Sequence, residues 1–173
     1  EAYNGATPYA AGALADGDIE PHFSKTIKVY DSQGSAHNIT MSFLKTGINE
    51  WSVEIHGPAE ELNGGNALVA NGVIKFNEDG SLDITNSTQA LFEPIGFQWS
   101  NGAAESQITF NFGTDGQADG LTQFDSASTM ISSSINGAVF GNVTGVSVGK
   151  DGVVTALFDN GLTRAVYKLP VAT

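Results

Sequence analysis

The sequence predicts an all-β protein built from antiparallel meanders, and three observations lead to that prediction. Apolar and polar residues alternate at period two in several short runs, which places one face of a strand on a core and the other in water. Asp-Gly and Asn-Gly pairs separate such runs near the C-terminus, and these dipeptides are strong hairpin signals. No segment keeps a helical period, so we expect a β-barrel or sandwich, with part of a second small β-module.

The clearest meander covers residues 26–55, and its strands are separated by DSQGS and KTGINE, each with a glycine able to take positive φ. In each strand one set of alternate residues is apolar and predicts the core face. These residues are Ile27 and Val29, then Ile39, Met41 and Phe43, then Trp51, Val53 and Ile55. The intervening residues, among them Ser42, Ser52, Glu54 and His56, are expected to face water.

The rest of the chain continues this pattern. Residues 1–23, rich in Ala, Gly, Pro and Asp, predict an extended arm or linker on the surface. Further strands are expected at 67–76 (bent at Gly72), 81–85, 94–100 and 107–112, whereas 86–93 is ambiguous. The Ser-rich stretch 124–135 predicts a connection. A second meander, at 142–148, 153–158 and 162–169, closes the chain.

Composition excludes several classes of protein. The 173 residues carry a formal net charge of −12, from 19 acidic against 7 basic residues, which argues against binding to nucleic acid or to an anionic membrane surface. The chain has no cysteine, so disulfides and thiolate metal sites are absent. No apolar run approaches the roughly 18 residues of a membrane helix, and the first residues do not resemble a signal peptide.

A calcium loop is the sharpest metal hypothesis. Asp115, Gln117, Asp119 and Gly120 take the first, third, fifth and sixth positions of an EF-hand-like loop, but Ser126 stands where the bidentate Glu belongs. Turn formation is therefore the preferred interpretation. The acidic group Asp16, Asp18 and Glu20 is likewise interpreted as linker.

No catalytic constellation is predicted. The three histidines, His22, His37 and His56, have no metal-ligand spacing, and His37 and His56 are interpreted as solvated. No nucleophile elbow is present, and 19 acidic residues make any carboxylate pair unspecific as a glycosidase signal. Trp51, Trp99 and Tyr30 could form a sugar-binding platform, although both tryptophans alternate in phase with core residues. We expect no catalytic residues, no cofactor and no metal.

Three blocks of the sequence resemble the bacterial flagellar hook protein family. They are TIKVYDSQGSAHNITMSFLKTGINEWSVEI, the hairpin-like IKFNEDGSL, and the return segment GNVTGVSVGKDGVVTALFDNGLTRAVYKLPVA, in the order that the family has. The resemblance implies a non-enzymatic subunit of the curved tube that joins the rod and motor to the filament. It implies residues 24–135 as an outer β-domain and 136–173 as return strands leading towards an inner domain, which could pack as part of the same unit.

The resemblance also implies partners and location. These are copies of the chain in a helical tube, and the rod, hook cap and hook–filament junction proteins through the parent protein. The location implied is extracellular, with export that leaves no cleaved signal peptide. The family's terminal helical segments are absent from this sequence, so we expect a central fragment that is monomeric by itself. A related flagellar rod protein and a carbohydrate-binding β-sandwich remain the alternatives.

Overall fold

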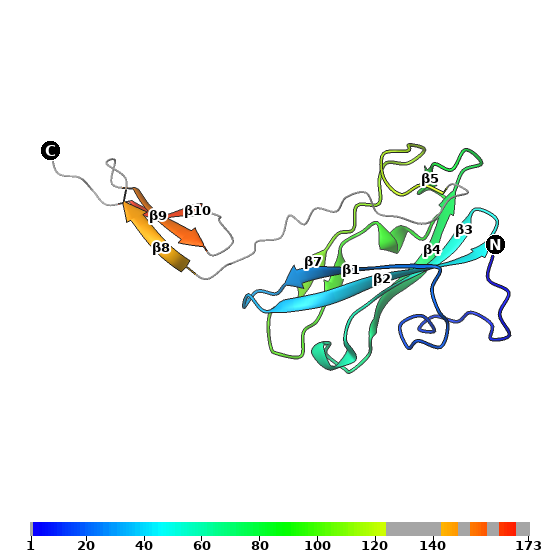
Figure 1. The fold of residues 1–173 in the computed structure, drawn as a ribbon, viewed down its shortest axis with the longest axis horizontal. Helices are drawn as coiled ribbons and strands as arrows, with labels where there is room; N and C mark the ends of the chain where they lie inside the picture. The colour runs from blue at the N-terminus through cyan, green and yellow to red at the C-terminus, as the bar shows by residue number, and fades with distance from the viewer. Residues whose placement is uncertain (1, 124–142, 149–152, 159–162, 169–173) are drawn as a thin grey trace. The chain divides into compact units, whose positions relative to one another are not determined.

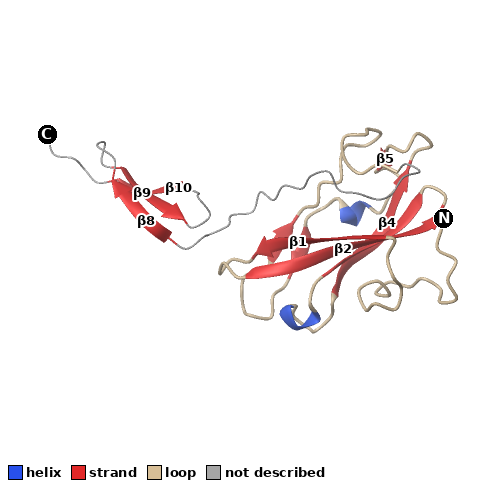
Figure 2. Cartoon of the chain, in the orientation of Figure 1, coloured by secondary structure: helices blue, strands red, loops and turns tan. Residues whose placement is uncertain are grey.

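Antiparallel strands make up nearly all the regular structure of this chain (Figures 1 and 2). The structure is a computed structural model, and it describes residues 2–123, 143–148, 153–158 and 163–168. Contacts divide the chain into two units, Glu1–Ile135 and Asn136–Thr173, which are described separately below. The described residues include no helix that is long and apolar enough to cross a membrane.

The first unit contains a five-stranded sheet in the order β1-β2-β3-β4-β5. Its strands are β1 (Phe23–Tyr30), β2 (Ala36–Gly47), β3 (Glu50–His56), β4 (Leu68–Phe76) and β5 (Leu82–Asp83). Each strand pairs antiparallel with the next in sequence, so the predicted meander is confirmed and extends by two strands. The sheet curls, as Figure 1 shows. Buried apolar residues of β1 to β5 lie on its concave side and form the core.

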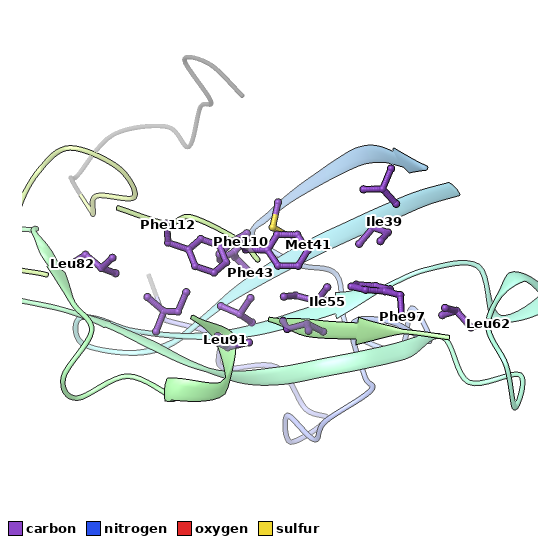
Figure 3. Packing of buried hydrophobic residues seen from close by; sticks show 14 of the residues in the cluster. Ile39, Met41, Phe43, Ile55, Leu62, Leu82, Leu91, Phe97, Phe110 and Phe112 are labelled. Atoms are coloured by element: carbon purple, nitrogen blue, oxygen red, sulfur yellow. The ribbon is translucent and has the colours of Figure 1, made fainter. Parts of the chain in front are cut away.

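A two-stranded ribbon, β6 (Ile95–Phe97) and β7 (Ser106–Ile108), covers part of this concave side. Buried residues of the sheet, of the ribbon and of neighbouring loops form one cluster, which is the core of the first unit (Figure 3). The largest side chains with almost no exposed surface in the described part include Phe97, Ile39, Leu44, Ile55, Ile74, Leu82 and Leu91. This arrangement lies between the predicted barrel and the predicted sandwich: an open curled sheet with a ribbon across its hollow face.

Two short 3-10 helices interrupt the loops, η1 (Ala59–Glu61) and η2 (Gln89–Leu91). The segment 86–93, which was ambiguous from the sequence, contains η2. Thr88 exchanges hydrogen bonds with Val73, because its N–H donates to the Val73 carbonyl at 2.8 Å and its Oγ1 accepts from the Val73 N–H at 2.9 Å. A Cβ on Gly72 would stand 2.7 Å from that of Thr88. The glycine therefore allows close packing of η2 against β4, whereas the pairing irregularity of β3 and β4 lies at Ile55/His56.

The predicted strand at 107–112 is wrong in its second half. Strand β7 ends at Ile108, although Phe110 and Phe112 are buried as their alternation predicts. The register pairs Ile108 with Ile95, so the next step of the ladder would place Thr109 against Pro94. Proline has no N–H to donate, and the ladder ends there.

The second unit contains a three-stranded sheet in the order β10-β9-β8. Its strands are β8 (Val143–Val148), β9 (Val153–Phe158) and β10 (Thr163–Lys168), all antiparallel. The predicted closing meander is confirmed, with ends that agree to within one residue. The predicted connection at 124–135 lies outside the described residues.

Candidate functional site

The N-terminal residues, predicted as an extended arm, instead fold back against the convex face of the first sheet. Ala13, Leu14 and Ile19 are buried there and pack with Leu44 of β2. As a result the face expected to meet water is covered: Ser42, Ser52 and Glu54 are 2%, 4% and 0% exposed. The central strands of the sheet are therefore buried on both faces.

Glu54 anchors this fold-back through its carboxylate. Oε1 accepts hydrogen bonds from the Tyr9 hydroxyl at 3.0 Å and the Gly12 N–H at 2.8 Å, and Oε2 accepts one from the Ala15 N–H at 2.9 Å. A buried carboxylate is tolerated only when it is hydrogen-bonded in this way. Burial, with the nearby charge of Glu54 and the hydrogen bond to it, raises the pKa of Tyr9 far above its ordinary value, so this phenol stays a donor.

His37 is buried, so the prediction that it is solvated is wrong. It lies in phase with Ile39 and Met41 on the core face of β2 and is 6% exposed. Its ring stacks on Trp99, with centroids 3.8 Å apart. Nε2 lies 3.0 Å from Asp31 Oδ2 and Nδ1 lies 2.7 Å from Glu61 Oε2, so the protonated ring joins two carboxylates from separate loops.

The pKa shifts follow from this geometry. Burial lowers the pKa of His37, but the hydrogen bonds to Asp31 and Glu61 outweigh it and raise that pKa above its ordinary 6.5. Burial would raise the pKa of Asp31; hydrogen bonds from His37, from Asn101 and from the N–H groups of Ser35 and Gln33 hold it well below its usual range. His56 shows the opposite behaviour to His37, since burial lowers its pKa.

The β2–β3 hairpin forms hydrogen bonds with residues near the N-terminus and with Gln123. At the N-terminal side, the Tyr3 N–H donates to the Lys45 carbonyl at 2.7 Å, and the Lys45 N–H donates to His22 Nδ1 at 3.0 Å. At the other side, Gln123 accepts the indole N–H of Trp51 at 2.6 Å and donates to Asn49 Oδ1 at 2.7 Å. The backbone N–H of Gln123 also donates to the Gly80 carbonyl, at 3.0 Å.

An open groove of about 480 Å³ lies between the N-terminal segment and the sheet. It is lined by residues of both, which are Tyr3, Gly5, Thr7, Pro8, Tyr9, Thr46, Glu50, Ser52 and Val73. No histidine lines it, and its one acidic residue, Glu50, lies 3.4 Å from the Lys75 ammonium. This groove offers no paired acid and base.

In the Asp/Gly loop predicted as the best metal candidate, the carboxylates of Asp115 and Asp119 both accept hydrogen bonds from other groups of the protein. Asp115 accepts hydrogen bonds from the Ile84 N–H at 2.6 Å and from the Thr85 hydroxyl at 3.3 Å. Asp119 accepts from the N–H and hydroxyl of Thr114, which lowers its pKa. Across the described residues no group of three histidine or acidic side chains is placed to hold a metal ion. Ser126 lies outside the part of the chain that is described.

The aromatic platform is not formed. Trp99 is 4% exposed, and its indole N–H donates to Ser106 Oγ at 2.8 Å. Trp51 is half-buried with its N–H directed to Gln123, and Tyr30 is also half-buried. The exposed carboxylates Asp16, Asp18 and Glu20 flank Ile19 on the fold-back. Sequence reasoning missed His37 and Glu54 as structural centres, although the phase of His37 with Ile39 was a usable signal.

Comparison with known proteins adds to this description. The family model described as "Flagellar basal body protein FlaE D2 domain" matches residues 6–138. The flagellar hook protein FlgE of Caulobacter vibrioides is 30% identical over 182 residues, covering 90% of this chain and 30% of that protein. FlgE of Helicobacter pylori strain 26695 is 34% identical over 177 residues, covering 98% and 24%. The chain thus spans about a third or less of the length of these relatives.

Solved structures have the same fold. A 32 kDa fragment of FlgE from Caulobacter crescentus superposes with a TM-score of 0.58 at 24% identity, over 72% of this chain and 50% of that one. FlgE2 of Helicobacter pylori superposes with a TM-score of 0.51 at 14% identity, over 85% of this chain and 32% of that one. The family match covers most of the chain and includes the fold-back as well as the curled sheet. The chain belongs to the FlaE D2 domain family of flagellar basal body proteins.

Proposed function

We propose that this chain is part of a structural subunit of the bacterial flagellar hook, the curved tube that transmits torque from the rod and motor to the filament. The observation that carries the proposal is the match of residues 6–138 to the D2 family model, together with relatives named as hook proteins. In such a subunit the chain has no catalytic role, no cofactor and no required metal. The absence of a required metal is supported by the acidic loop, where Asp115 and Asp119 already accept hydrogen bonds from the N–H groups of Ile84 and Thr114.

We infer that the first unit is the outer β-domain and that residues 136–173 are the return strands towards an inner domain. The division of contacts at Ile135 and Asn136 supports this inference. The fold-back and the extent of the family match favour including residues 6–23 in the outer domain rather than in a separate linker. The location proposed is outside the cell, in the hook, reached by export without a cleaved signal peptide.

The partners proposed are further copies of the parent protein in a helical tube, and the rod, hook cap and hook–filament junction proteins at its ends. A subunit in a tube that bends while it rotates has to exchange contacts with its neighbours. A strongly acidic surface suits small, polar and wet contacts of that kind better than one large apolar interface. By itself the chain is proposed to be monomeric.

The carbohydrate-binding alternative loses its best support. A sugar platform needs an aromatic ring in contact with solvent. Trp99 is instead buried and contacts the His37 and Phe97 rings, and the indole N–H of Trp51 donates to Gln123. A related rod protein remains a second candidate, because the family model is described in terms of the basal body. The relatives reported above are named as hook proteins, which favours the hook.

Immunogold electron microscopy of flagella from the source bacterium tests the proposal. Antibodies raised against this chain should decorate the curved segment between the cell body and the filament. The same antibodies pre-absorbed with the chain are the control, and a strain that lacks the parent gene should have no curved segment. Label on the rod alone would favour the rod protein. Normal hooks in the deletion strain would refute the proposed function.

A further inference from the structure

Six Asn-Gly pairs occur in the sequence, and the structure places those that it describes in different surroundings. In such a pair the glycine has no Cβ to obstruct its backbone nitrogen, which can attack the side-chain carbonyl of the asparagine before it. The asparagine then loses ammonia. The described pairs are Asn4–Gly5, Asn63–Gly64, Asn71–Gly72 and Asn101–Gly102, and those at 136 and 160 lie outside the described residues. The reacting groups are identical at each pair, so their surroundings decide which of them reacts.

The pair Asn63–Gly64 lies at the tip of the loop that joins β3 to β4. Asn63, Gly64 and Gly65 are exposed, and a Cβ added to either glycine would meet nothing within 4 Å. Among the described residues, neither the Asn63 side chain nor the Gly64 N–H has a hydrogen-bonding partner. One turn bond, from the Gly65 N–H to the Leu62 carbonyl at 3.1 Å, spans the pair. Rotation of the backbone at Asn63 therefore has to break only this bond.

The pair Asn71–Gly72 has the same two residues within strand β4. Gly72 pairs with Val53 in the ladder between β3 and β4, and a Cβ on it would stand 2.7 Å from that of Thr88. Thr88 in turn forms hydrogen bonds with both backbone groups of Val73. Rotation of the backbone at Asn71 would therefore break the ladder on one side and the contact with Thr88 on the other.

The pair Asn101–Gly102 is held through the asparagine side chain. Its amide nitrogen donates to Asp31 Oδ2 at 2.6 Å, and its amide oxygen accepts from the Ala103 N–H at 3.0 Å. Attack on the side-chain carbonyl would break both hydrogen bonds. It would also replace the amide by a carboxylate next to the buried carboxylate of Asp31, where two negative charges repel.

The pair Asn4–Gly5 lies between these cases. Both residues are exposed, but the Tyr3 side chain occupies the space into which a Cβ of Gly5 would project. The Tyr3 hydroxyl also donates to the Thr7 carbonyl at 2.9 Å, which closes a small loop around the pair. We expect a rate between that of Asn63 and those of the two held pairs.

We propose that Asn63 is a site of covalent modification in the folded chain, at which asparagine converts to aspartate and isoaspartate through a cyclic imide. Hydroxide takes the proton from the Gly64 backbone nitrogen, which attacks the side-chain carbonyl carbon of Asn63. A C–N bond forms, the bond to the side-chain NH2 breaks, and ammonia leaves with a proton from water. Water then opens the ring at one of its two carbonyls. This chemistry needs only the folded chain and water, so it does not depend on the proposed function.

The β3–β4 loop can tolerate this change. Before the pair, the chain is anchored by buried Leu62 and by the Asn63 N–H, which donates to the Gln98 carbonyl at 2.8 Å. At the base of the loop, the Gly57 N–H donates to the Ala67 carbonyl at 3.0 Å. The extra backbone methylene of an isoaspartate falls in the exposed tip between these anchors, and the new carboxylate faces water. Modification therefore makes the surface more acidic and leaves the fold intact.

Incubation of the chain in mildly alkaline buffer, followed by peptide mapping with mass spectrometry, tests the proposal. The mass change from NH2 to OH is followed over time at Asn63, Asn71 and Asn101, and the same incubation in concentrated urea gives the rate of each pair without structure. In the folded chain Asn63 should react close to its rate in urea. Asn71 and Asn101 should react at least about tenfold more slowly than in urea, because they react only after local opening. Equal rates at the three pairs in the folded chain, or equally strong protection of all three, would overturn the proposal.

Asn63→Gln is the first control, because it keeps the amide but adds a methylene that prevents closure of the five-membered ring. Asn63 and Asn71 lie in one tryptic peptide, between Lys45 and Lys75. With Asn63→Gln, conversion in this peptide should fall to the slow rate of Asn71. Conversion that persists would place the reaction at Asn71 and overturn the assignment.

Two further variants test whether the fold tolerates the product. Asn63→Asp and Asn101→Asp each introduce the charge that the reaction would produce. Asn63→Asp should leave the urea midpoint of the chain unchanged, whereas Asn101→Asp removes a donor to Asp31 and should lower it. A midpoint lowered as much by Asn63→Asp as by Asn101→Asp would show that the loop does not tolerate the modification, and the inference would fail.

Discussion

Glu54 is expected to hold the N-terminal fold-back on the sheet, and Glu54→Ala removes that anchor. The substitution deletes one acceptor of the Tyr9 hydroxyl and leaves the N–H groups of Gly12 and Ala15 without their acceptors. An orphaned buried donor costs about 1–3 kcal/mol, and hydrogen bonds to a charged group contribute about 1.5–3 kcal/mol each. The Gly12 contact is buried and the Ala15 contact is partly buried, so the first should account for more of the loss.

Taken together, Glu54→Ala should lower the free energy of unfolding by about 3–4 kcal/mol, at the level of other broken buried polar networks. The loss is limited by the docking energy of the fold-back itself, because the segment can detach and return its N–H groups to water. Tyr9→Phe removes one of the three hydrogen bonds to this carboxylate. Because the Tyr9 contact is only partly buried, its loss should cost about 1.5 kcal/mol, the lower end of that range. Urea unfolding followed by tryptophan fluorescence measures both values.

Glu60→Ala is the matched control, since it also removes one negative charge but from an exposed side chain on η1. It should change stability by less than about 0.5 kcal/mol. Limited proteolysis gives a second readout: Glu54→Ala should expose the segment around Ala13 and Leu14 to cleavage under conditions where the sheet stays folded. Equal urea midpoints for Glu54→Ala and Glu60→Ala, with the segment still protected, would refute the anchoring role.

Three further results are expected. Because the pKa of His37 is raised in the folded state, its protonated ring should stabilise the fold below about pH 6.5, and this stabilisation should decline as pH rises through the raised pKa. The lowered pKa of Asp31 acts in the opposite direction, so stability should also fall below about pH 4 as this carboxylate is protonated. Melting temperatures from pH 3 to 9 should show both declines, and His37→Gln should abolish the alkaline one. Phe97→Ala should cost about 3–5 kcal/mol and exposed Thr109→Ala less than about 0.5, by denaturant midpoint; the reverse order would show that the core is misassigned. Light scattering across concentration and salt should give one 18.0 kDa chain, and a stable dimer at micromolar concentration would contradict the expected weak contacts.

The strands were predictable from the sequence because the ladder in this chain is local. Each of the first five strands pairs with the next, and the hairpins carry their own turn signals. At the β1–β2 turn, Asp31 Oδ1 accepts from the N–H groups of Gln33 and Ser35, and Gly34 takes φ 86°. All of these residues are within a few positions of one another, so the pattern can be read directly.

The candidate site was not predictable in the same way. Glu54 meets partners 39–45 residues earlier in the chain, and His37 meets Glu61, which is 24 residues later. Period-two alternation assigns one face of a strand to the core, but it cannot say that a remote segment will cover the other. Ser42 and Ser52 are small and uncharged, so they can be buried under such a segment. Only the phase of His37 with the core residues of β2 was visible beforehand.

The fold-back also has a consequence for the order in which the chain folds. Its partners on β2 and β3 follow it in sequence, so when the chain appears N-terminus first the segment has nothing to dock on until Glu54 has emerged. Loop closure over that separation comes after the local hairpins, which form faster. The fold-back should therefore be a late event, absent from the transition state. On that account substitutions at Glu54 should accelerate unfolding and leave the rate of folding nearly unchanged.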